Sequence, residues 1–385
     1  MLPQSNHPDD ATLAGRVWRP GLGPCIVAVR GDDLVDVTSA EVPTMQALVE
    51  RDDASDWLRA APGELIGTLA GMAAGSTETA GEDTSHFLAP ADLQAIKASG
   101  VTFAESMVER VIEEQAAGNA DRAEEIRQKV QAAIGDSLRG IVPGSDEAMQ
   151  VKAVLQREGF WSQYLEVGIG PDAEIFTKSQ PMSAVGWGAA VGLHPKSSWN
   201  NPEPEIVLAV DSCGTIKAAT LGNDVNLRDI EGRSALLLGK AKDNNASCAI
   251  GPFLRFFDES YSLDDVRNAE LTLRVEGEDG FVLEGHSSMA KISRDPADLV
   301  AQTRGRHHQY PDGFLLFLGT LFAPIQDRDA PGQGFTHKSG DRVSISEARL
   351  GELSNTVRLS TECPEWTFGT AALMRNLASR DLLRS

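Results

Sequence analysis

Short apolar runs separated by turn residues dominate the second half of the chain. After about residue 172, runs of Val, Ile and Leu alternate with Gly, Asn and Asp, and each run has the length of a strand. Strands are expected at 205–210, 215–221, 269–275, 314–320 and 341–346. Because helical spacing is rare among them, this half of the chain is predicted to be a β-rich domain.

The first ninety residues carry a smaller version of this pattern. β-like runs lie at 15–18 and 25–29, a turn follows at 31–33, and a third β-like run lies at 34–37. Residues 44–72 have helical spacing in patches, and 73–87 are small and polar, as in a linker. The sequence therefore predicts a small N-terminal α+β domain over residues 1–90 and a second domain over 91–385.

Helical spacing marks the segment that follows the linker. Residues 102–136 are rich in Glu, Ala, Arg and Gln, and their apolar residues recur every three or four positions. This stretch is predicted to be one long helix or a helical hairpin that turns near Gly118-Asn119. The helical segment as a whole extends over about 102–160.

The net charge restricts the classes of partner. The chain has 385 residues, of which 41% are hydrophobic, and can bury a large core. Its formal charge of −21 would repel phosphate backbones and anionic membranes, so no nucleic-acid partner is expected. The longest apolar stretch, Gly313 to Ile325, has 13 residues and is shorter than the roughly 20 residues that a membrane helix needs. No membrane association is expected.

The cysteines and the first residues bear on the compartment. The four cysteines, at 25, 213, 248 and 363, have no paired spacing, so neither disulfides nor a thiolate metal site is expected. Residues 1–10 lack the basic and then apolar pattern of an export signal. We expect a cytoplasmic protein.

Three carboxylates form the candidate chemical site. Glu203 and Glu205 lie two positions apart at the start of an expected strand, so they project to the same side. A turn at 211–214 would return the chain antiparallel and bring Asp224 back beside them. Three carboxylates without cysteine or histidine suit Mg²⁺ or Mn²⁺. On this spacing alone, a solvated strand edge remains an alternative for the Glu-x-Glu pair.

Four motifs around these carboxylates resemble those of the fumarylacetoacetate hydrolase family, in the family's order. They are Phe-x-Lys, Glu-x-Glu, Asn-Asp-x-x-x-Arg-Asp and Ala-Lys followed by Gly-Pro, at 176–178, 203–205, 223–229 and 241–252. The segments 319–320, 339–343 and 350–357 are similar to the family's closing motifs. The resemblance covers roughly residues 90–360.

The resemblance implies a fold, an assembly and a set of site residues. The fold would be of the α+β class, a mixed β-roll with a helical lid segment, assembled as a homodimer or a higher homo-oligomer. The metal ligands would be Glu203, Glu205 and Asp224, with Mg²⁺ (or Mn²⁺) as the cofactor. The implied substrate contacts are Lys178, Arg228 and Thr320.

One departure from the family changes the expected reaction. The hydrolases carry a histidine and a glutamate one helical turn apart in the lid, and this pair activates water. Here Ser106 stands at the histidine position, and Glu109 keeps the glutamate position. Because a serine is no general base near neutral pH without an activator, water attack becomes doubtful. The family's Gly-Thr-Pro is also altered, to Gly319-Thr320-Leu321.

The chain resembles the sugar-acid dehydratase branch of the family in three features, which are Ser106, the motif at 241–252 and the chain length. This branch implies a metal-dependent hydro-lyase. It would convert a 2-keto-3-deoxypentonate, derived from D-xylonate or L-arabinonate, into 2-oxoglutarate semialdehyde and water. The small-molecule partner would be a 2-keto-3-deoxy sugar acid.

The acid and base of such a reaction remain open at the level of sequence. Lys242 is the first candidate base, because burial would lower its pKa, but it could instead hold the enolate or only neutralise the carboxylates. Glu109 is a candidate base or acid, and Ser106 could orient the departing hydroxyl. Lys178 contacts substrate or balances charge.

Arg228 also has two interpretations. It either binds the substrate carboxylate or pairs with Asp229 or Glu231.

Two other functions compete with dehydration. A C–C hydrolase of acylpyruvates or diketo sugar acids would need His194 or His286 to replace the missing histidine. A non-catalytic role in metal binding or assembly would leave the metal pocket closed, or the lid segment away from it. His307 and His308 are expected in a surface loop, and no histidine is assigned to the metal.

Overall fold

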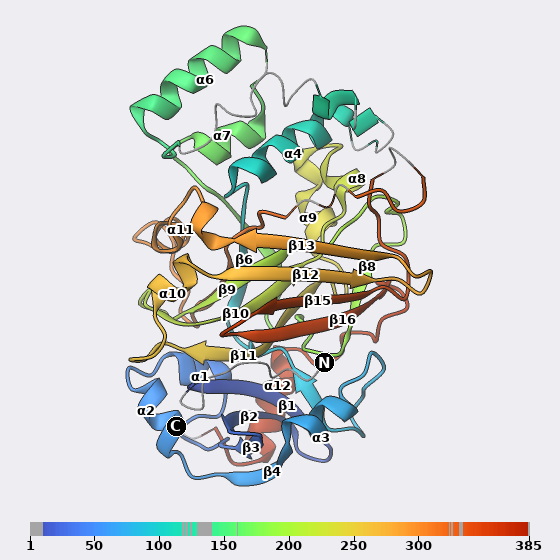
Figure 1. The fold of residues 1–385 in the computed structure, drawn as a ribbon. Helices are drawn as coiled ribbons and strands as arrows, with labels where there is room; N and C mark the ends of the chain where they lie inside the picture. Colours follow the sequence, from blue (N-terminus) through green and yellow to red (C-terminus); the bar gives the residue numbers. More distant parts are fainter. Residues whose placement is uncertain are drawn as a thin grey trace.

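The computed structural model describes residues 11–383, apart from 118, 120–121, 124, 129–140, 160, 323, 325 and 331–333. Within the described part of the chain, the strands form two sheets, of eleven and five strands. Helices lie mainly at the two ends of the molecule (Figure 1). This arrangement agrees with the α+β class expected from the sequence.

The larger sheet runs from the N-terminal strands to the strands that carry the carboxylates. Its order is β4-β3-β2-β1-β11-β10-β9-β14-β6-β7, and β5 pairs with β1 off this path. The strands are β1 (Leu13–Arg19), β2 (Gly23–Arg30), β3 (Asp33–Asp36), β4 (Glu64–Thr68), β5 (His86–Leu88), β6 (Ala95–Gly100), β7 (Glu174–Ser179), β9 (Pro204–Val210), β10 (Ile216–Asp224), β11 (Cys248–Phe256) and β14 (Phe314–Phe317).

The smaller sheet covers one face of the larger sheet and has the order β13-β12-β15-β16-β8. Its strands are β8 (Ala190–Leu193), β12 (Glu270–Glu276), β13 (Val282–Ser288), β15 (Arg342–Glu347) and β16 (Gly351–Leu359). On β12, Leu271, Leu273 and Val275 are buried, while the residues between them are exposed. The buried face packs in one apolar cluster with Ile206 and Leu208 of β9, so the core lies between the sheets.

Most of the helices are short. They are α1 (Met45–Val49), α2 (Ala54–Ala60), α3 (Leu69–Gly75), α4 (Ala104–Ala116), α6 (Asp146–Glu158), α7 (Gln163–Ile169), α8 (Arg228–Glu231), α9 (Leu238–Lys242), α10 (Leu263–Arg267), α11 (Pro296–Thr303) and α12 (Thr370–Ser379), with 3₁₀ turns η1 (Ala235–Leu237) and η2 (Met289–Lys291).

Helices α4, α6 and α7 form a separate layer at one end of the molecule (Figure 1). Their apolar cluster includes Val111 and Ile112 of α4 and Leu165 of α7. Gly168 of α7 faces Met107 so closely that a Cβ atom would overlap the Met107 sulfur. This layer is the helical lid segment that the sequence predicts.

The end of α4 decides between the two helical alternatives. Ala117, with a φ of 52°, is left-handed and ends the helix next to the predicted turn at Gly118-Asn119. One uninterrupted helix over 102–136 is therefore wrong. Residues 129–136 lie outside the described part of the chain.

The strand predictions are confirmed with small shifts. The five expected runs correspond to β9, β10, β12, β14 and β15, although β14 ends at Phe317 rather than at 320. The stretch 44–72 contains helices as expected, but also β4, which the sequence pattern missed. Strand β4 is a mostly exposed edge strand, so it lacks the apolar alternation by which strands are recognised.

The N-terminal strands belong to the same sheet as the carboxylate strands. Leu13 and Ala14 of β1 pair with Arg255 and Leu254 of β11. The division near residue 90 remains a prediction, and the hydrogen-bonded sheet extends across it.

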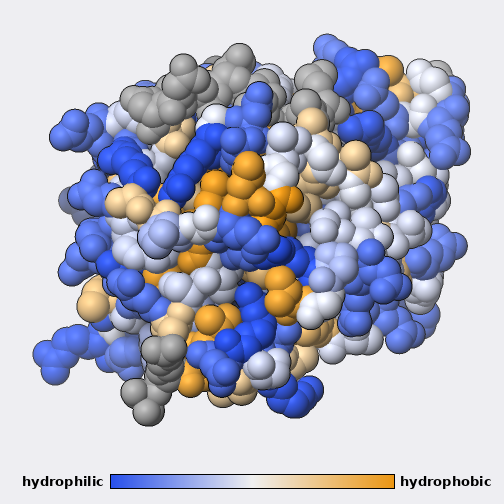
Figure 2. All heavy atoms as spheres, turned by 90° about the horizontal axis from the view of Figure 1, so that it is seen from below, coloured by the Kyte–Doolittle hydropathy of each residue, from blue (hydrophilic) through white to orange (hydrophobic). Residues whose placement is uncertain are grey.

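The surface seen from below has several apolar patches, and hydrophilic residues separate them (Figure 2). Exposed apolar residues include Leu65 of β4 and Met374 of α12.

Two further sequence predictions can be compared with the structure. Cys25, Cys213, Cys248 and Cys363 are all free thiols. In the part of the chain that the structure describes, every helix is too short or too polar to cross a membrane.

Candidate metal centre

The β9–β10 hairpin brings the three predicted ligands together. Glu205 pairs with Gly222, and the backbone N–H of Asp224 donates to the carbonyl oxygen of Glu203 at 3.1 Å. One carboxylate oxygen from each of Glu203, Glu205 and Asp224 lies within 4.8 Å of the others. All three residues are buried, which excludes the solvated strand edge.

Two lysines offset part of this negative charge. Lys242 Nζ lies 2.7 Å from Glu203 Oε2 and 3.0 Å from Asp224 Oδ2. Lys178 Nζ lies 2.8 Å from Asp224 Oδ1 and donates to the carbonyl oxygen of Lys242 at 2.6 Å. Burial disfavours the ionised form of Asp224, but these two ammonium groups outweigh it and lower the Asp224 pKa.

Glu205 is without a cationic partner among the described residues. Its Oε2 accepts a hydrogen bond from the backbone N–H of Gly319 at 2.6 Å. Burial and the neighbouring Asp224 and Glu203 carboxylates raise the Glu205 pKa well above its ordinary value. Gly319 has a φ of 88° and faces Thr102, so a side chain at this position would be strained and would collide.

This donor set fits a hard divalent cation. Glu205 has no positive partner in the described structure, and Asp224 Oδ1 has an ion pair but no hydrogen bond of regular geometry. Three clustered carboxylates in a buried site supply the oxygen ligands that Mg²⁺ and Mn²⁺ prefer.

The charge state of Lys242 differs from the sequence expectation. Burial does disfavour its ammonium form, but the carboxylates of Asp224, Glu203 and Glu231 more than offset this and raise the Lys242 pKa. The expected lowering of the Lys242 pKa is therefore wrong. Lys242 is an ammonium group here, in agreement with the alternative that it neutralises the carboxylates.

Arg110, which the sequence analysis missed, reaches the same site from the lid helix α4. Its guanidinium pairs with Glu203 and lies 2.8 Å from Glu113 and 3.2 Å from Glu231. Glu231 of α8 is also buried, 3.9 Å from Lys242 Nζ. Burial, with the carboxylates of Glu203 and Glu113, raises the pKa of Glu231 to about 7, although Arg110 and Lys242 oppose the shift.

The cavity at this site is small in the present conformation. The space left free amounts to about 20 Å³, enough for about one water molecule or ion. A larger molecule would need the cavity to widen. The cavity is lined by Ser99, Gly100, Val101, Ser106, Arg110, Glu174, Phe176, Glu203, Glu205, Asp224, Glu231, Lys242, Gly319 and Thr320.

The two hydroxyl residues expected at the site both line this cavity. Ser106 Oγ donates to the carbonyl oxygen of Phe103 at 2.8 Å, at the start of α4. Thr320 Oγ1 accepts from the backbone N–H of Phe322 at 3.0 Å. Both hydroxyl groups could reorient toward a bound molecule.

Glu109 and Arg228 lie away from the cavity lining. Oε2 of Glu109 lies 2.9 Å from Arg127 and 3.2 Å from Arg228. Arg228 also donates to Glu113, at 2.6 Å, so the expected pairing with Asp229 or Glu231 is wrong. In this conformation, Arg228 attaches α8 to the lid helix and does not face the metal ligands.

The described cavity lining contains no histidine. His307 and His308 are exposed, as expected. His286 pairs with Glu270 on the smaller sheet, and His194 contacts Lys240. Neither histidine occupies the position that a water-activating base would need.

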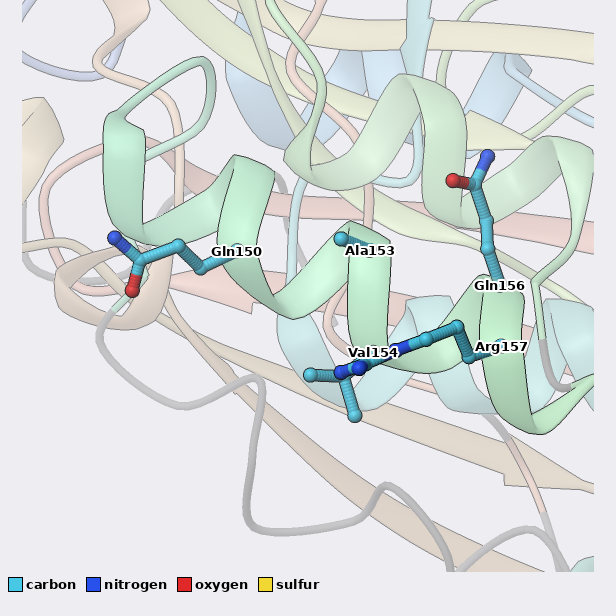
Figure 3. A pocket seen from close by; sticks show the side chains of 5 residues that line it. All are labelled: Gln150, Ala153, Val154, Gln156 and Arg157. Atoms are coloured by element: carbon cyan, nitrogen blue, oxygen red, sulfur yellow. The ribbon is translucent and has the colours of Figure 1, made fainter.

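A second depression lies on the exposed side of α6 and shares no residue with the metal cavity. It has a volume of about 640 Å³ and is lined by Gln150, Ala153, Val154, Gln156 and Arg157 (Figure 3). All five side chains come from one helix and include one charged group. This surface offers no cluster of reactive or metal-binding groups.

A family comparison bears on this fold and site. Residues 171–358 match the model of the fumarylacetoacetate (FAA) hydrolase C-terminal family. The matched segment includes the three clustered carboxylates.

Two curated relatives carry dehydratase names. The chain is 33% identical over 188 residues to 2-dehydro-3-deoxy-D-arabinonate dehydratase of Saccharolobus solfataricus. It is 30% identical over 194 residues to a "probable 2-keto-3-deoxyxylonate dehydratase" of Haloferax volcanii. The alignments cover 48% and 50% of this chain, and 58% and 63% of the relatives. The chain thus spans less than two thirds of either relative's length.

Solved structures with the same fold include 2-keto-3-deoxy-D-arabinonate dehydratase. Its apo form matches with a TM-score of 0.63 and 21% identity, covering 90% of this chain and 99% of the other. The same enzyme complexed with magnesium and 2,5-dioxopentanoate matches with a TM-score of 0.62, also at 21% identity and with the same coverage. At this identity the likeness establishes the fold.

Proposed function

We propose that this protein is a metal-dependent hydro-lyase. It converts a 2-keto-3-deoxypentonate, derived from D-xylonate or L-arabinonate, into 2-oxoglutarate semialdehyde and water, with Mg²⁺ (or Mn²⁺) as cofactor. The main support for this proposal is the buried cluster of Glu203, Glu205 and Asp224. The lid helix beside it carries Ser106 where a hydrolase would place a histidine. The dehydratase names of the curated relatives support the same reaction.

The three carboxylates would hold the cation. A divalent cation bound there would supply Lewis-acid polarisation of the ketone oxygen of a 2-oxo acid and so acidify the protons on C3. Lys178 and Lys242 orient Asp224 and Glu203 by direct ion pairs. The buried ammonium of Lys242 also favours negative charge developing on a nearby substrate oxygen.

The lid helix supplies the remaining polar contacts. Arg110 is the cation on α4 that reaches Glu203, and it is available to an anionic substrate once the metal satisfies that carboxylate. Ser106 and Thr320 line the cavity and would contact the hydroxyl or carboxylate groups of the sugar acid.

Hydrolysis has less support from the site. A hydrolase needs a group that removes a proton from water, and the described cavity lining contains no histidine. For a purely structural role the site gives mixed support. The small cavity agrees with a closed pocket, but Ser106 and Arg110 of the lid both reach the cavity. Assembly as a homodimer or higher oligomer and a cytoplasmic location remain predictions.

A coupled assay tests the reaction. Purified protein with Mg²⁺ is given 2-keto-3-deoxyxylonate or 2-keto-3-deoxyarabinonate and a semialdehyde dehydrogenase, with acetylpyruvate in parallel. We expect semialdehyde formation that is lost in Glu203→Ala and kept in Glu284→Gln, which alters an exposed carboxylate on the other sheet. Cleavage of acetylpyruvate without semialdehyde would refute the proposal.

A further inference from the structure

Val101 has a strained backbone conformation at the metal cavity. Its φ is 56°, in the left-handed region, and it is the one β-branched residue with a positive φ in the described part of the chain. A branched Cβ atom is disfavoured there, and such strain persists only where the surrounding structure enforces it, most often at functional sites. Val101 is buried and lines the cavity beside the three carboxylates.

The residues on both sides of Val101 hold it in this conformation. Gly100 is the last residue of β6 and pairs with β7. On the other side, Thr102 Oγ1 donates to the carbonyl oxygen of Leu318 at 2.7 Å, and the carbonyl oxygen of Thr102 accepts from the backbone N–H of Ser293 at 2.8 Å. Because both neighbours are fixed, relaxation of Val101 to a negative φ would disturb these contacts.

The backbone N–H of Val101 is a donor in a buried residue. Within the described part of the chain, neither a backbone nor a side-chain atom accepts a hydrogen bond from it. A buried N–H group that nothing satisfies is rare and costly, so this donor is expected to have an acceptor when the site is occupied. A strained backbone and an unused donor thus coincide at the same cavity.

Strand pairing places Val101 next to Thr320. Strands β6 and β14 run parallel, and the last pair in their register is Ala98 with Phe317. Val101 and Thr320 each lie three residues beyond that pair, and both line the cavity. The two residues therefore reach the cavity from neighbouring strand ends.

The chemistry of the donor restricts what it can bind. An N–H group pairs with an acceptor, and the strongest of these hydrogen bonds are made to ionised oxygens. In a 2-oxo acid, the ionised oxygens are those of the carboxylate. A carboxylate that leaves water for a buried site needs hydrogen-bond donors there.

We infer that the backbone N–H of Val101 binds the carboxylate of the 2-keto-3-deoxypentonate beside Thr320, and that the left-handed conformation of Val101 directs this donor into the cavity. This inference rests on the proposed function. Recognition of the acid group then depends in part on a main-chain atom, which the type of side chain at this position does not reveal.

Replacement of Val101 by the α-hydroxy analogue of valine tests the inference, because the resulting backbone ester keeps the side chain and removes the N–H. We expect the binding of pyruvate to the Mg²⁺-loaded protein, measured by calorimetry, to weaken by about 10-fold or more. Mg²⁺ binding without pyruvate and the urea midpoint should change little, since no described residue accepts from this N–H. The same replacement at Val142, which is exposed, is the matched control and should leave all three measurements unchanged.

Pyruvate separates this inference from the proposed function. If the wild-type protein binds pyruvate but forms no semialdehyde, the dehydratase proposal fails, and the ester variant still decides the role of Val101. Where semialdehyde forms, kcat/KM should fall in the ester variant by a similar factor. If that variant keeps pyruvate binding and kcat/KM within about twofold of wild type, the inference is overturned. Absence of pyruvate binding and turnover in the wild-type protein overturns both.

A comparison of glycine with alanine tests the strain independently. Glycine adopts a positive φ freely and alanine does not, so the urea midpoint of Val101→Gly should be no lower than that of Val101→Ala. At Val282, an exposed residue of β13, the glycine variant should be the less stable of the same pair.

The same two variants report on binding. Because glycine also lets the N–H turn away from the cavity, Val101→Gly should bind pyruvate more weakly than Val101→Ala. Equal or tighter binding by Val101→Gly, or a lower urea midpoint, would contradict the inference.

Discussion

Nε of Arg228 donates a hydrogen bond of 2.6 Å to Oε1 of Glu113, and both side chains are buried. This bond joins α8, which follows the strand that ends at Asp224, to α4, which covers the cavity. The guanidinium of Arg228 also lies over the Trp199 ring at 4.4 Å. The position of the lid helix is therefore coupled through charged contacts to the segment that follows Asp224.

Replacement of Arg228 by Met should loosen the lid. Glu113 would lose one of its two guanidinium partners in a buried position and keep Arg110, so the cost should lie below the roughly 3–5 kcal/mol of a buried charge left without any partner. We expect a lower unfolding temperature and faster amide hydrogen exchange in α4. Arg157→Gln, on the exposed side of α6, serves as the control. Unchanged exchange in α4 would show that the lid docks without this contact.

Glu205→Gln should raise the stability of the metal-free protein and weaken its binding of Mg²⁺. In the metal-free protein, Glu205 is buried among carboxylates, and its raised pKa means that the ionised form is unfavourable. A neutral amide should stabilise the metal-free protein near neutral pH by about 1–2 kcal/mol and raise its unfolding temperature. The same variant should bind Mg²⁺ much more weakly in calorimetry. A destabilised metal-free protein would contradict this reading of the site.

Arg110→Gln should strengthen Mg²⁺ binding to the substrate-free protein. The guanidinium is paired with Glu203, so it competes with a divalent cation for that carboxylate. Its removal should raise the Mg²⁺ affinity by roughly 3- to 10-fold in calorimetry. Arg127→Gln is the control. Arg127 pairs with Glu109, which lies on α4 as Arg110 does, and its replacement should not alter the Mg²⁺ affinity. Equal or weaker binding by Arg110→Gln would show that Arg110 does not compete.

Glu231 should make the stability of the metal-free protein depend on pH. Its pKa is about 7 in the folded state against an ordinary value of 4.5, so the folded state holds the proton more tightly than the unfolded chain does. This contribution is present in full below about pH 4.5 and is lost as the pH rises to about 7, with an upper limit of about 3 kcal/mol. Urea unfolding of wild type and Glu231→Gln across this range should show a shallower decline for the variant. If stability falls equally with pH in both proteins, Glu231 is not the cause of this pH dependence.

The carboxylate cluster could be predicted from the sequence because it depends on a local hairpin. Once two adjacent strands pair, Glu203, Glu205 and Asp224 must lie near one another whatever the rest of the chain does. Arg110 and Glu174 are different, since they reach the site from elements distant in sequence, and their approach depends on the packing of α4 and β7. Because every second residue of a strand lies on the same face, counting back from Lys178 and Phe176 in steps of two would have found Glu174.

The chemical state of the site residues was harder to predict than their position. Lys242 does lie beside the carboxylates of Glu203 and Asp224, but its pKa depends on how many carboxylates surround it. The sequence could not show that Glu231 joins Asp224 and Glu203 around this lysine. Arg228 likewise follows the family motif, but its partners are set by the docking of α4.

The pairing of β1 with β11 has a consequence for a shortened chain. A polypeptide that begins near residue 90 would lack β1, so Leu254 and Arg255 of β11 would lose their backbone partners, beside a run of apolar side chains. Unpaired strand edges favour association with other chains. The first ninety residues therefore shield this part of the larger sheet, and we expect the shortened polypeptide to be recovered mainly as aggregates.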